Sequence, residues 1–485
     1  MEINQLTIKQ AKEKLSNKEI SSLELVEACI NRIENTDDKL KAFLATDFDN
    51  AREQAKKVDK KISLGKKLDP LEGIPCSIKD LILTKGIETT ASSNMLCNYI
   101  PQFNATVVEK LKKAGAIILG KNNCDAWGHG SSTENSDFGP SHNPWDLKKV
   151  PGGSSGGSAA SVVADQVIFA LGTDTGGSIR QPSSLCGTVG LKPTYGRVSR
   201  FGAIAMGSSL DTIGPITKSV ADAAQVLEVI AGQDKKDSTT PDVKVPDYSS
   251  FLGKDIRDFK IAIPKQAFGE GIDKDVEAVV KNSFREFEKL GAKIEEVDMK
   301  LLDVGLAVYY IIMPSEVSSN LGRYDGIRYG HSSDKVSDLL EVYTKNRAEG
   351  LGTEAKRRIM IGTYTLSAGY YDAYYKKAMQ VRTLIKQEFD QILAKFDLIL
   401  MPVSPTTAFK IGDKADDPME MYLADIYTGS LNLAGVPGMS IPCGFVDNLP
   451  VGLQVISKQF AEEKIFQAAF AYEQATNWNR LKPEL

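Results

Sequence analysis

The sequence predicts an α/β fold in which a β-sheet is buried between helices. Short apolar runs, such as residues 116–119 and 167–170, recur from residue 73 onward and are separated by glycine-rich turns. Segments with helical periodicity, such as residues 219–231, lie between those runs. Apolar runs of strand length that alternate with amphipathic helices are typical of sheets covered by helices.

Residues 1–65 are expected to form a helical N-terminal segment that packs on the rest of the chain. Ser21 and Glu24 have the spacing of a capping box, in which each side chain bonds the backbone N–H of the other residue. Behind them, apolar residues recur four positions apart and form one stripe: Leu25, Cys29 and Ile33. The polar stretch 49–67 predicts a second, exposed helix.

Residues 232–258 are polar, contain two prolines and are expected to form a long surface connection. A strand, a helix and another strand are predicted after it, at residues 260–263, 273–290 and 293–297. Helices then dominate to about residue 395. Two further strands and a last helix are expected at residues 398–402, 451–456 and 462–476.

The composition excludes several classes of protein. The 59 basic and 63 acidic residues give a net charge of -4 and are spread along the chain, so no broad nucleic-acid surface is indicated. The six cysteines show no C-x-x-C spacing, which disfavours a zinc site and a redox pair. The N-terminus lacks a signal-peptide pattern, and no run of about 18 apolar residues predicts a membrane span. We expect a reduced, cytoplasmic protein without a metal.

Residues 151–160 hold four glycines and three serines. A flexible linker is disfavoured because the apolar stretch 159–170 follows at once, whereas Gly/Ser linkers lie between polar neighbours. A phosphate-binding loop is disfavoured because no lysine follows the glycines. The nearest match to such a loop, residues 115–122, has an apolar interior and is interpreted as a buried strand with a turn.

Residues 153–157 also match the G-x-S-x-G nucleophile elbow, which requires a histidine base later in the chain. Of the three histidines, His129 and His142 precede the motif, and His331 lies in a polar segment. Each is interpreted as a surface or structural residue. A Ser-His-Asp triad in that order is therefore disfavoured.

Lys79 offers a different base, because it lies in the apolar segment 73–80, where a lysine is unusual. The alternative is a lysine paired with Asp80 at a strand end. To act as a base, Lys79 would need its pKa lowered from ~10.4 by ~3 units, which corresponds to about 4 kcal/mol. Burial together with hydrogen-bonding hydroxyls would supply that change.

A second serine-bearing loop, residues 172–180, follows an apolar strand, and Ser178 precedes a predicted helix start. The small residues at positions 175–177 would let several backbone N–H groups point at one spot, as an oxyanion hole requires. The alternative is a tight strand-to-helix turn with Ser178 as the N-cap.

At these residues the sequence resembles the amidase signature family. The resemblance rests on the Gly-Ser-Ser-Gly-Gly-Ser core at residues 153–158, on residues 172–182 and on the upstream lysine. It implies a large mixed, twisted β-sheet covered by helices on both faces, in a single amidase domain over residues 1–485.

The resemblance also implies a Ser-Ser-Lys triad. Matching the motif positions gives Ser178 as the nucleophile, Ser154 as a bridging serine held by a cis peptide, and Lys79 as the base. The oxyanion hole would be formed by backbone N–H groups of one loop: Thr175, Gly176, Gly177 and Ser178.

Within that family, five further segments are similar to the A subunits of tRNA-dependent amidotransferases: residues 131–135, 143–146, 197–202, 208–214 and 432–438. The similarity implies a cytoplasmic glutaminase that supplies ammonia to a B subunit, with a small C subunit completing a heterotrimer. ATP and magnesium would belong to the B subunit, which would also make most of the contacts to misacylated tRNA, and this chain would need no cofactor. Glu-tRNA(Gln) and, in many bacteria, Asp-tRNA(Asn) would be the acceptors.

A glutaminase needs a cation for the α-carboxylate and an anion for the α-ammonium of its substrate. Arg358 and Asp425 match the family's positions for these roles, and Tyr309 is a candidate third contact for which Tyr310 competes. The alternative is that Arg358 is a charge on a helix face and that the tyrosines belong to the core.

Residues 124–129 depart from the family pattern. The corresponding segment of these relatives commonly reads Met-Asp-Glu-Phe-Ala-Met, whereas this chain reads Cys-Asp-Ala-Trp-Gly-His. We expect this segment at the pocket rim, where it would affect substrate preference. Two rival interpretations stay open: a stand-alone amidase for another small carboxamide, and a structural protein of a complex without catalysis.

Overall fold

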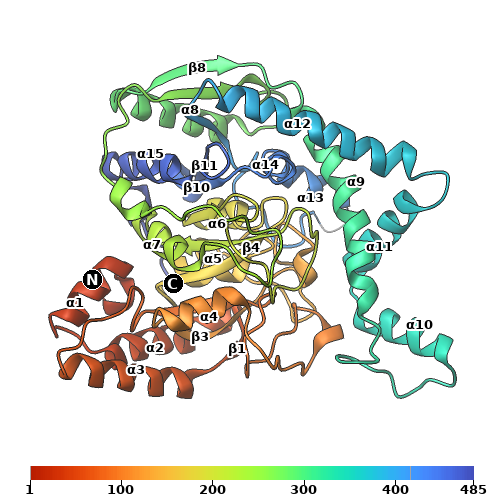
Figure 1. Cartoon of the computed structure of the whole chain (residues 1–485), viewed down its shortest axis with the longest axis horizontal. Coiled ribbons are helices and arrows are strands. Elements are labelled where there is room, and N and C mark those ends of the chain that lie inside the picture. Colours follow the sequence, from red (N-terminus) through yellow and green to blue (C-terminus); the bar gives the residue numbers. More distant parts are fainter. Residues whose placement is uncertain (1, 415–416) are drawn as a thin grey trace.

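A mixed sheet of eleven strands runs through the molecule (Figure 1). The computed structural model describes residues 2–414 and 417–485. The strands follow the order β1-β3-β2-β4-β6-β5-β10-β11-β9-β7-β8 across the sheet. Their bounds are Phe43–Thr46 (β1), Pro75–Lys79 (β2), Ile117–Asn122 (β3), Phe169–Asp174 (β4), Val189–Lys192 (β5), Thr212–Thr217 (β6), Lys260–Pro264 (β7), Lys293–Val297 (β8), Leu398–Pro402 (β9), Gly438–Val446 (β10) and Leu449–Ile456 (β11). The predicted α/β class and mixed sheet are confirmed.

Helices cover both faces of this sheet. Successive side chains of a strand point to opposite faces. In β3, Ile117 and Leu119 pack in one apolar cluster with residues of α2, α3 and α5, whereas Ile118 packs in a second cluster that includes α7. The helices are α1 Ile8–Ser16, α2 Ser22–Leu40, α3 Phe48–Ser63, α4 Thr106–Lys113, α5 Gly156–Val163, α6 Arg180–Cys186, α7 Val220–Ile230, α8 Lys274–Lys289, α9 Leu302–Asn320, α10 Leu339–Gly350, α11 Thr353–Leu366, α12 Lys377–Leu393, α13 Pro418–Tyr422, α14 Gly429–Ala434 and α15 Glu462–Ala475.

The neighbouring strands β2 and β4 run parallel, with Cys76 opposite Phe169 and Ile78 opposite Leu171. Parallel neighbours end at the same edge of a sheet, so the last residue of β2, Lys79, and the loop after β4 lie side by side. Ligands of open α/β sheets commonly bind at such carboxyl ends. The topology therefore brings the lysine and one serine loop to a common edge.

The helix predictions from periodicity are largely confirmed. Ser21 and Glu24 form the predicted capping box at the start of α2, and α7, α8 and α15 begin and end within one residue of the expected ranges. The second helix is confirmed as α3, which ends at Ser63, earlier than expected; it is exposed or half-buried except for a stripe of Ala51, Ala55 and Val58. A helix with few apolar residues can still bury a narrow stripe when those residues are small.

Residues 232–258 contain no α-helix or strand and are mostly exposed or half-buried. A short 3-10 helix, Tyr248–Phe251, anchors the segment. Its Tyr248 is fully buried, and the ring lies 5.1 Å from that of Phe466 in α15. Within residues 2–414 and 417–485, none of the helices has the length and hydrophobicity of a membrane span.

The expected buried strand with a turn in residues 115–122 is confirmed: the turn lies at Gly115, and the buried strand β3 follows and continues through Gly120 and Lys121. Lys121 can stay buried because its ammonium has three partners. Its Nζ atom donates to the carbonyl of Ile82 at 2.8 Å and to Thr89 Oγ1 at 2.6 Å, and it lies 3.4 Å from Asp80. A buried strand can include a lysine when hydrogen bonds and an ion pair compensate its ammonium for the lost hydration.

The glycine- and serine-rich loop enters the core directly, as α5 begins at Gly156 and all its residues are buried. The peptide bond between Gly153 and Ser154 is cis. Gly157 lies against backbone, since a Cβ atom there would come 2.5 Å from the carbonyl oxygen of Asn123 and 2.7 Å from that of Ala42. The linker interpretation is thereby excluded, and the glycines serve close packing.

Gly157→Ala should destabilise the fold by about 1–3 kcal/mol, because the added methyl group must displace two backbone carbonyls. Gly269→Ala is the matched control, because a Cβ there has no neighbour within 4 Å. Urea unfolding of both variants measures the difference. Equal stability of the two variants would contradict this account of the loop.

Candidate active site

Lys79 occupies the last position of β2 with its side chain fully buried. Its Nζ atom lies 2.7 Å from Ser154 Oγ and 2.9 Å from Ser155 Oγ. Asp80 faces Lys121 instead, at 3.4 Å. The alternative of a Lys79–Asp80 pair is therefore wrong, because adjacent strand residues point to opposite faces.

Burial lowers the pKa of Lys79 to about 8, and neighbouring groups, led by Cys124 and Asp125, oppose the shift. The charged form is disfavoured because an ammonium loses its hydration in the interior. An amine with this pKa is substantially neutral in mildly alkaline solution, and its lone pair can take a proton from Ser154 across the 2.7 Å contact. Lys79 thus has the position and proton affinity of a general base.

Ser155 holds Lys79 in place, a role that the sequence analysis missed. Its Oγ atom donates to the carbonyl of Thr173 at 3.1 Å. A hydroxyl has one proton, so Ser155 must accept at its contact with Lys79. The adjacent serine in the same motif was the available signal.

Ser178 lies in the loop after β4 and is largely buried. Its carbonyl accepts from the backbone N–H of Ser155 at 3.1 Å, which fastens the two serine loops to each other. The N-cap of α6 is Ile179, so the alternative of Ser178 as a helix cap is wrong. Among the described residues no hydrogen bond joins the hydroxyls of Ser154 and Ser178; the structure pairs Lys79 with Ser154 and places Ser178 in the adjoining loop.

A buried ion pair shapes this second loop. Arg180 donates to both carboxylate oxygens of Asp174, from Nε and Nη2, each at 3.0 Å. The same carboxylate accepts from the backbone N–H groups of Gly177 at 2.9 Å and Ile179 at 3.1 Å. Burial would raise the pKa of Asp174, but the Arg180 guanidinium outweighs it and holds the pKa at about 2. The loop is therefore wrapped around a permanent negative charge.

The expected set of oxyanion donors needs one correction. The N–H of Gly177 is bound to Asp174, so it is committed to the protein itself. Gly177 has φ +144°, and a side chain there would collide with Thr428. The backbone N–H groups of Thr175, Gly176 and Ser178 have no hydrogen-bond acceptor within residues 2–414 and 417–485. These three are the available donors.

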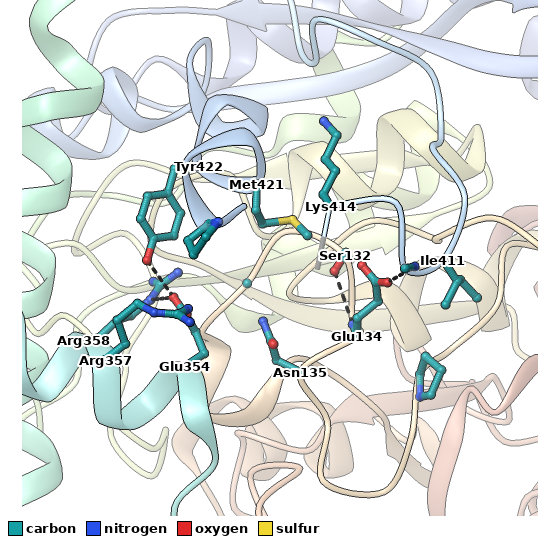
Figure 2. Close-up of a pocket in the computed structure, with 14 residues that line it drawn as sticks. Ser132, Glu134, Asn135, Glu354, Arg357, Arg358, Ile411, Lys414, Met421 and Tyr422 are labelled. Carbon is teal, nitrogen blue, oxygen red and sulfur yellow. Dashed lines mark hydrogen bonds and ion pairs between the residues drawn. The ribbon is translucent and has the colours of Figure 1, made fainter. Parts of the chain in front are cut away.

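Arg358 lies on α11 beside a polar pocket of 330 Å³ (Figure 2). Its Nε donates to Glu354 Oε1 at 2.7 Å, one helical turn away, and the hydroxyl of Tyr422 donates to the same oxygen at 3.1 Å. The side chain is buried, and its pairing with Glu354 on the same helix is compatible with the alternative of a helix-face charge as well as with a binding role. The pocket is lined by Gly130, Ser132, Glu134, Asn135, Pro140, Glu354, Arg357, Arg358, Ile411, Gly412, Lys414, Pro418, Met421 and Tyr422.

Asp425 is the buried anion of the same region. Its carboxylate accepts from Ser131 Oγ at 2.9 Å and from the hydroxyl of Tyr310 at 2.8 Å. Burial raises the pKa of Asp425 to about 6, while those two hydrogen bonds oppose the rise. Asp425 is therefore ionised at neutral pH.

The two adjacent tyrosines of α9, Tyr309 and Tyr310, contact different parts of the site. Tyr310 binds Asp425, whereas the phenol of Tyr309 lies against Gly176, where a Cβ would come 2.5 Å from its hydroxyl oxygen. The ring planes are perpendicular at a centroid distance of 5.0 Å. Tyr309 thus adjoins the oxyanion loop and Tyr310 adjoins Asp425; both also pack in the main apolar cluster, as the alternative of core tyrosines expected.

The segment 124–129 is buried, and its Ala126 lines a pocket beside Glu354, so its expected effect on substrate preference stays a prediction. Asp125 accepts from the backbone N–H groups of Thr133 at 2.9 Å and Asn135 at 3.1 Å. Its own N–H donates to the carbonyl of Ser154 at 3.3 Å. Asp125 therefore supports the serine loop, whereas the ring nitrogens of Trp127 and His129 have no hydrogen-bond partner among the described residues.

Comparisons with known proteins identify relatives of the whole chain. The amidase family model matches residues 24–466. The A subunit of the glutamyl-tRNA(Gln) amidotransferase from Heliobacterium modesticaldum is 55% identical over 471 residues, covering 97% of both chains. The crystal structure of the same protein from Thermotoga maritima has 44% identity and a TM-score of 0.83, and covers 100% of this chain and 98% of that one. A bacterial aryl acylamidase structure has 26% identity and a TM-score of 0.86, with 98% and 97% covered.

Arg180→Met should destabilise the chain by about 3–5 kcal/mol, because it leaves the carboxylate of Asp174 buried without its partner. Lys14→Met is the control: it removes one half of the solvent-exposed Lys14–Glu19 pair and should change stability by less than about 1 kcal/mol. Chemical denaturation compares the two. A loss at Arg180 no larger than that at Lys14 would show that the ion pair does not hold the loop.

Proposed function

This chain belongs to the amidase family, and we propose that it is the glutamine-hydrolysing component, the A subunit, of a glutamyl-tRNA(Gln) amidotransferase. The observation that carries the proposal is one pocket region that combines a buried base with two opposite charges. Lys79 contacts Ser154 at 2.7 Å. Arg358 and Asp425, the cation and the anion that an amino-acid substrate requires, are both buried, and both border Tyr310, at 5.6 Å from its ring and 2.8 Å from its hydroxyl respectively.

In the proposed reaction, neutral Lys79 takes a proton from Ser154 as Ser154 takes one from Ser178. The Ser178 oxygen attacks the side-chain amide carbon of glutamine, and the carbonyl becomes an oxyanion facing the N–H groups of Thr175, Gly176 and Ser178. The proton returns through Ser154 to the leaving nitrogen, and ammonia departs. Water then attacks the acyl-enzyme, and glutamate leaves as Ser178 regains its proton.

The substrate's two charged groups, which share one carbon atom, would be held by the two side chains that border Tyr310. Arg358 would bind the α-carboxylate and Asp425 the α-ammonium, with Tyr309 contacting the bound molecule beside Gly176. Arg358 is now paired with Glu354 at 2.7 Å. A bound carboxylate would share this guanidinium, because Arg has five N–H donors in a fixed fork.

The ammonia would serve a partner. We infer a cytoplasmic heterotrimer in which a B subunit, using ATP and magnesium, activates Glu-tRNA(Gln), and a C subunit supports the assembly. Asp-tRNA(Asn) is a second candidate acceptor by the same chemistry. The T. maritima and H. modesticaldum proteins are each named as one subunit of an amidotransferase, which supports a multi-subunit enzyme.

A stand-alone amidase is the second candidate, because an aryl acylamidase shares the fold at a TM-score of 0.86. The two functions differ in the amide that is hydrolysed and in whether partner subunits increase the rate. Ammonia release from glutamine, measured for this chain alone and after co-expression with B and C subunits, should be fastest in the complex. Hydrolysis of many other amides without glutamine would exclude the amidotransferase function.

Ser154→Ala should lower the rate of glutamine hydrolysis by roughly 10²- to 10⁴-fold, because the proton relay loses its middle group. Ser158→Ala is a matched control, a buried serine four residues on whose hydroxyl donates to the carbonyl of Leu171 at 3.3 Å. It should retain activity. Ammonia release by both purified variants tests this, and comparable losses in the two would remove the special role of Ser154.

The pH profile of kcat/KM for glutamine should rise in two steps, with inflections at about 6 and about 8. The lower step reports ionisation of Asp425, and the upper one reports loss of the proton from Lys79. Both groups work in their deprotonated forms, so activity increases with pH at each step. Asp425→Asn should abolish the lower step. A profile that is flat between pH about 7 and about 9 would contradict the assignment of Lys79 as the base that loses its proton at about 8.

A further inference from the structure

His129 is a buried histidine without a hydrogen-bond partner for its ring. The residue is 1% exposed. Neither Nδ1 nor Nε2 has a partner within residues 2–414 and 417–485. The backbone is fixed, because its N–H donates to the carbonyl of Ala126 at 3.0 Å and its own carbonyl accepts from Asn135 Nδ2 at 2.9 Å. A buried polar group left unpaired costs about 1–3 kcal/mol, and such groups need an explanation.

The neighbours of His129 belong to the proposed substrate region. On one side, a Cβ atom on Gly128 would come within 3.6 Å of Ser154 Oγ. Two residues further on, Ser131 donates to Asp425 at 2.9 Å. Residues 128–131 therefore connect the neighbourhood of Ser154 to that of Asp425, and His129 lies between these two contacts in the chain.

The ring is also close enough to Arg358 to be influenced by its charge. Burial, and then the positive charge of Arg358, hold the pKa of His129 well below its usual value. The imidazole is therefore neutral, with one N–H donor and one acceptor nitrogen. A neutral donor can lie beside a guanidinium where a second cation would be repelled.

We propose that His129 is a substrate-binding residue whose imidazole N–H donates to the α-carboxylate of glutamine, next to Arg358. This rests on the proposed function. Arg358 has its Nε on Glu354 and an Nη1 atom 3.3 Å from the sulfur of Met313, so part of its fork is already committed. A carboxylate offers about four acceptor sites, and a second donor from His129 would fill one that Arg358 leaves open.

The proposal gives a meaning to the departure at residues 124–129. Compared with an apolar side chain of similar volume, such as methionine, the imidazole adds one N–H donor. Placed beside Arg358, that donor would serve the carboxylate of the substrate and not its distant side-chain amide. Selectivity for amides that carry a carboxylate should therefore depend on His129.

The test compares two substrates of the holoenzyme: glutamine, and 4-aminobutanamide, which is glutamine without its carboxylate. His129→Leu should raise KM for glutamine about tenfold with little change in kcat, and leave KM for 4-aminobutanamide unchanged. If that amide is not hydrolysed, its inhibition constant against glutamine replaces its KM. His129→Gln, which keeps an N–H donor, should restore most of the loss, and His129→Met should behave like His129→Leu. His331→Leu, at an exposed histidine paired with Glu349 at 2.8 Å, is the control.

An equal loss for both compounds in His129→Leu would show a merely structural role and overturn the proposal. An unchanged KM for glutamine in a folded His129→Leu enzyme would overturn it as well, and would mean that water satisfies the ring. Both outcomes leave the glutaminase function standing. A wild-type enzyme that releases no ammonia from glutamine, alone or in the complex, would instead remove the proposed function and this inference with it.

Discussion

The ion pair between Asp174 and Arg180 is the contact on which the catalytic region depends. Both side chains are fully buried, and a buried pair is stable only when its remaining donors and acceptors are also bound. Arg180 meets this requirement by reaching two other elements. It donates to Asn432 of α14 at 2.7 Å and to Gln454 of β11 at 2.5 Å. The loop between β4 and α6 is thereby fixed to strands and helices from distant parts of the sequence.

This anchoring explains the geometry of the oxyanion loop. Asp174 accepts the N–H of Gly177 and Ile179, which turns the chain around the carboxylate. Arg180 also donates to the carbonyl of Thr428 at 3.2 Å. The hydroxyl of Thr428 in turn donates to the carbonyl of Gly176 at 2.5 Å. The loop is thus held from both sides, and the remaining N–H groups stay available without reorganising during reaction, as electrostatic catalysis requires.

Much of the fold could be predicted from local pattern. The periodicity of residues 219–231 and 273–290 and the capping box at Ser21 depend on neighbours within one or two turns, so the sequence reports them directly. Lys79 was recognisable because a charge in an apolar strand is unusual. The apolar run of residues 115–122 likewise indicated a buried strand, but the partners of its Lys121, which are Ile82, Thr89 and Asp80, could not be predicted because no local pattern reveals a distant partner.

The amino-acid sequence alone specified the reactive groups: a lysine at a strand end, two serine loops, and an arginine and an aspartate suited to an amino acid. Tertiary structure alone decided their partners. Only the three-dimensional structure shows that Ser155 accepts a hydrogen bond from Lys79 and that Tyr310 donates one to Asp425. It also shows that the ring of His129 has no hydrogen-bond partner among the described residues. The reason is separation along the chain: Ser131 and Asp425 are 294 residues apart, yet they share a hydrogen bond. Periodicity reports short-range order, whereas the chemistry of a buried side chain is set by whatever the packed sheet and helices bring next to it.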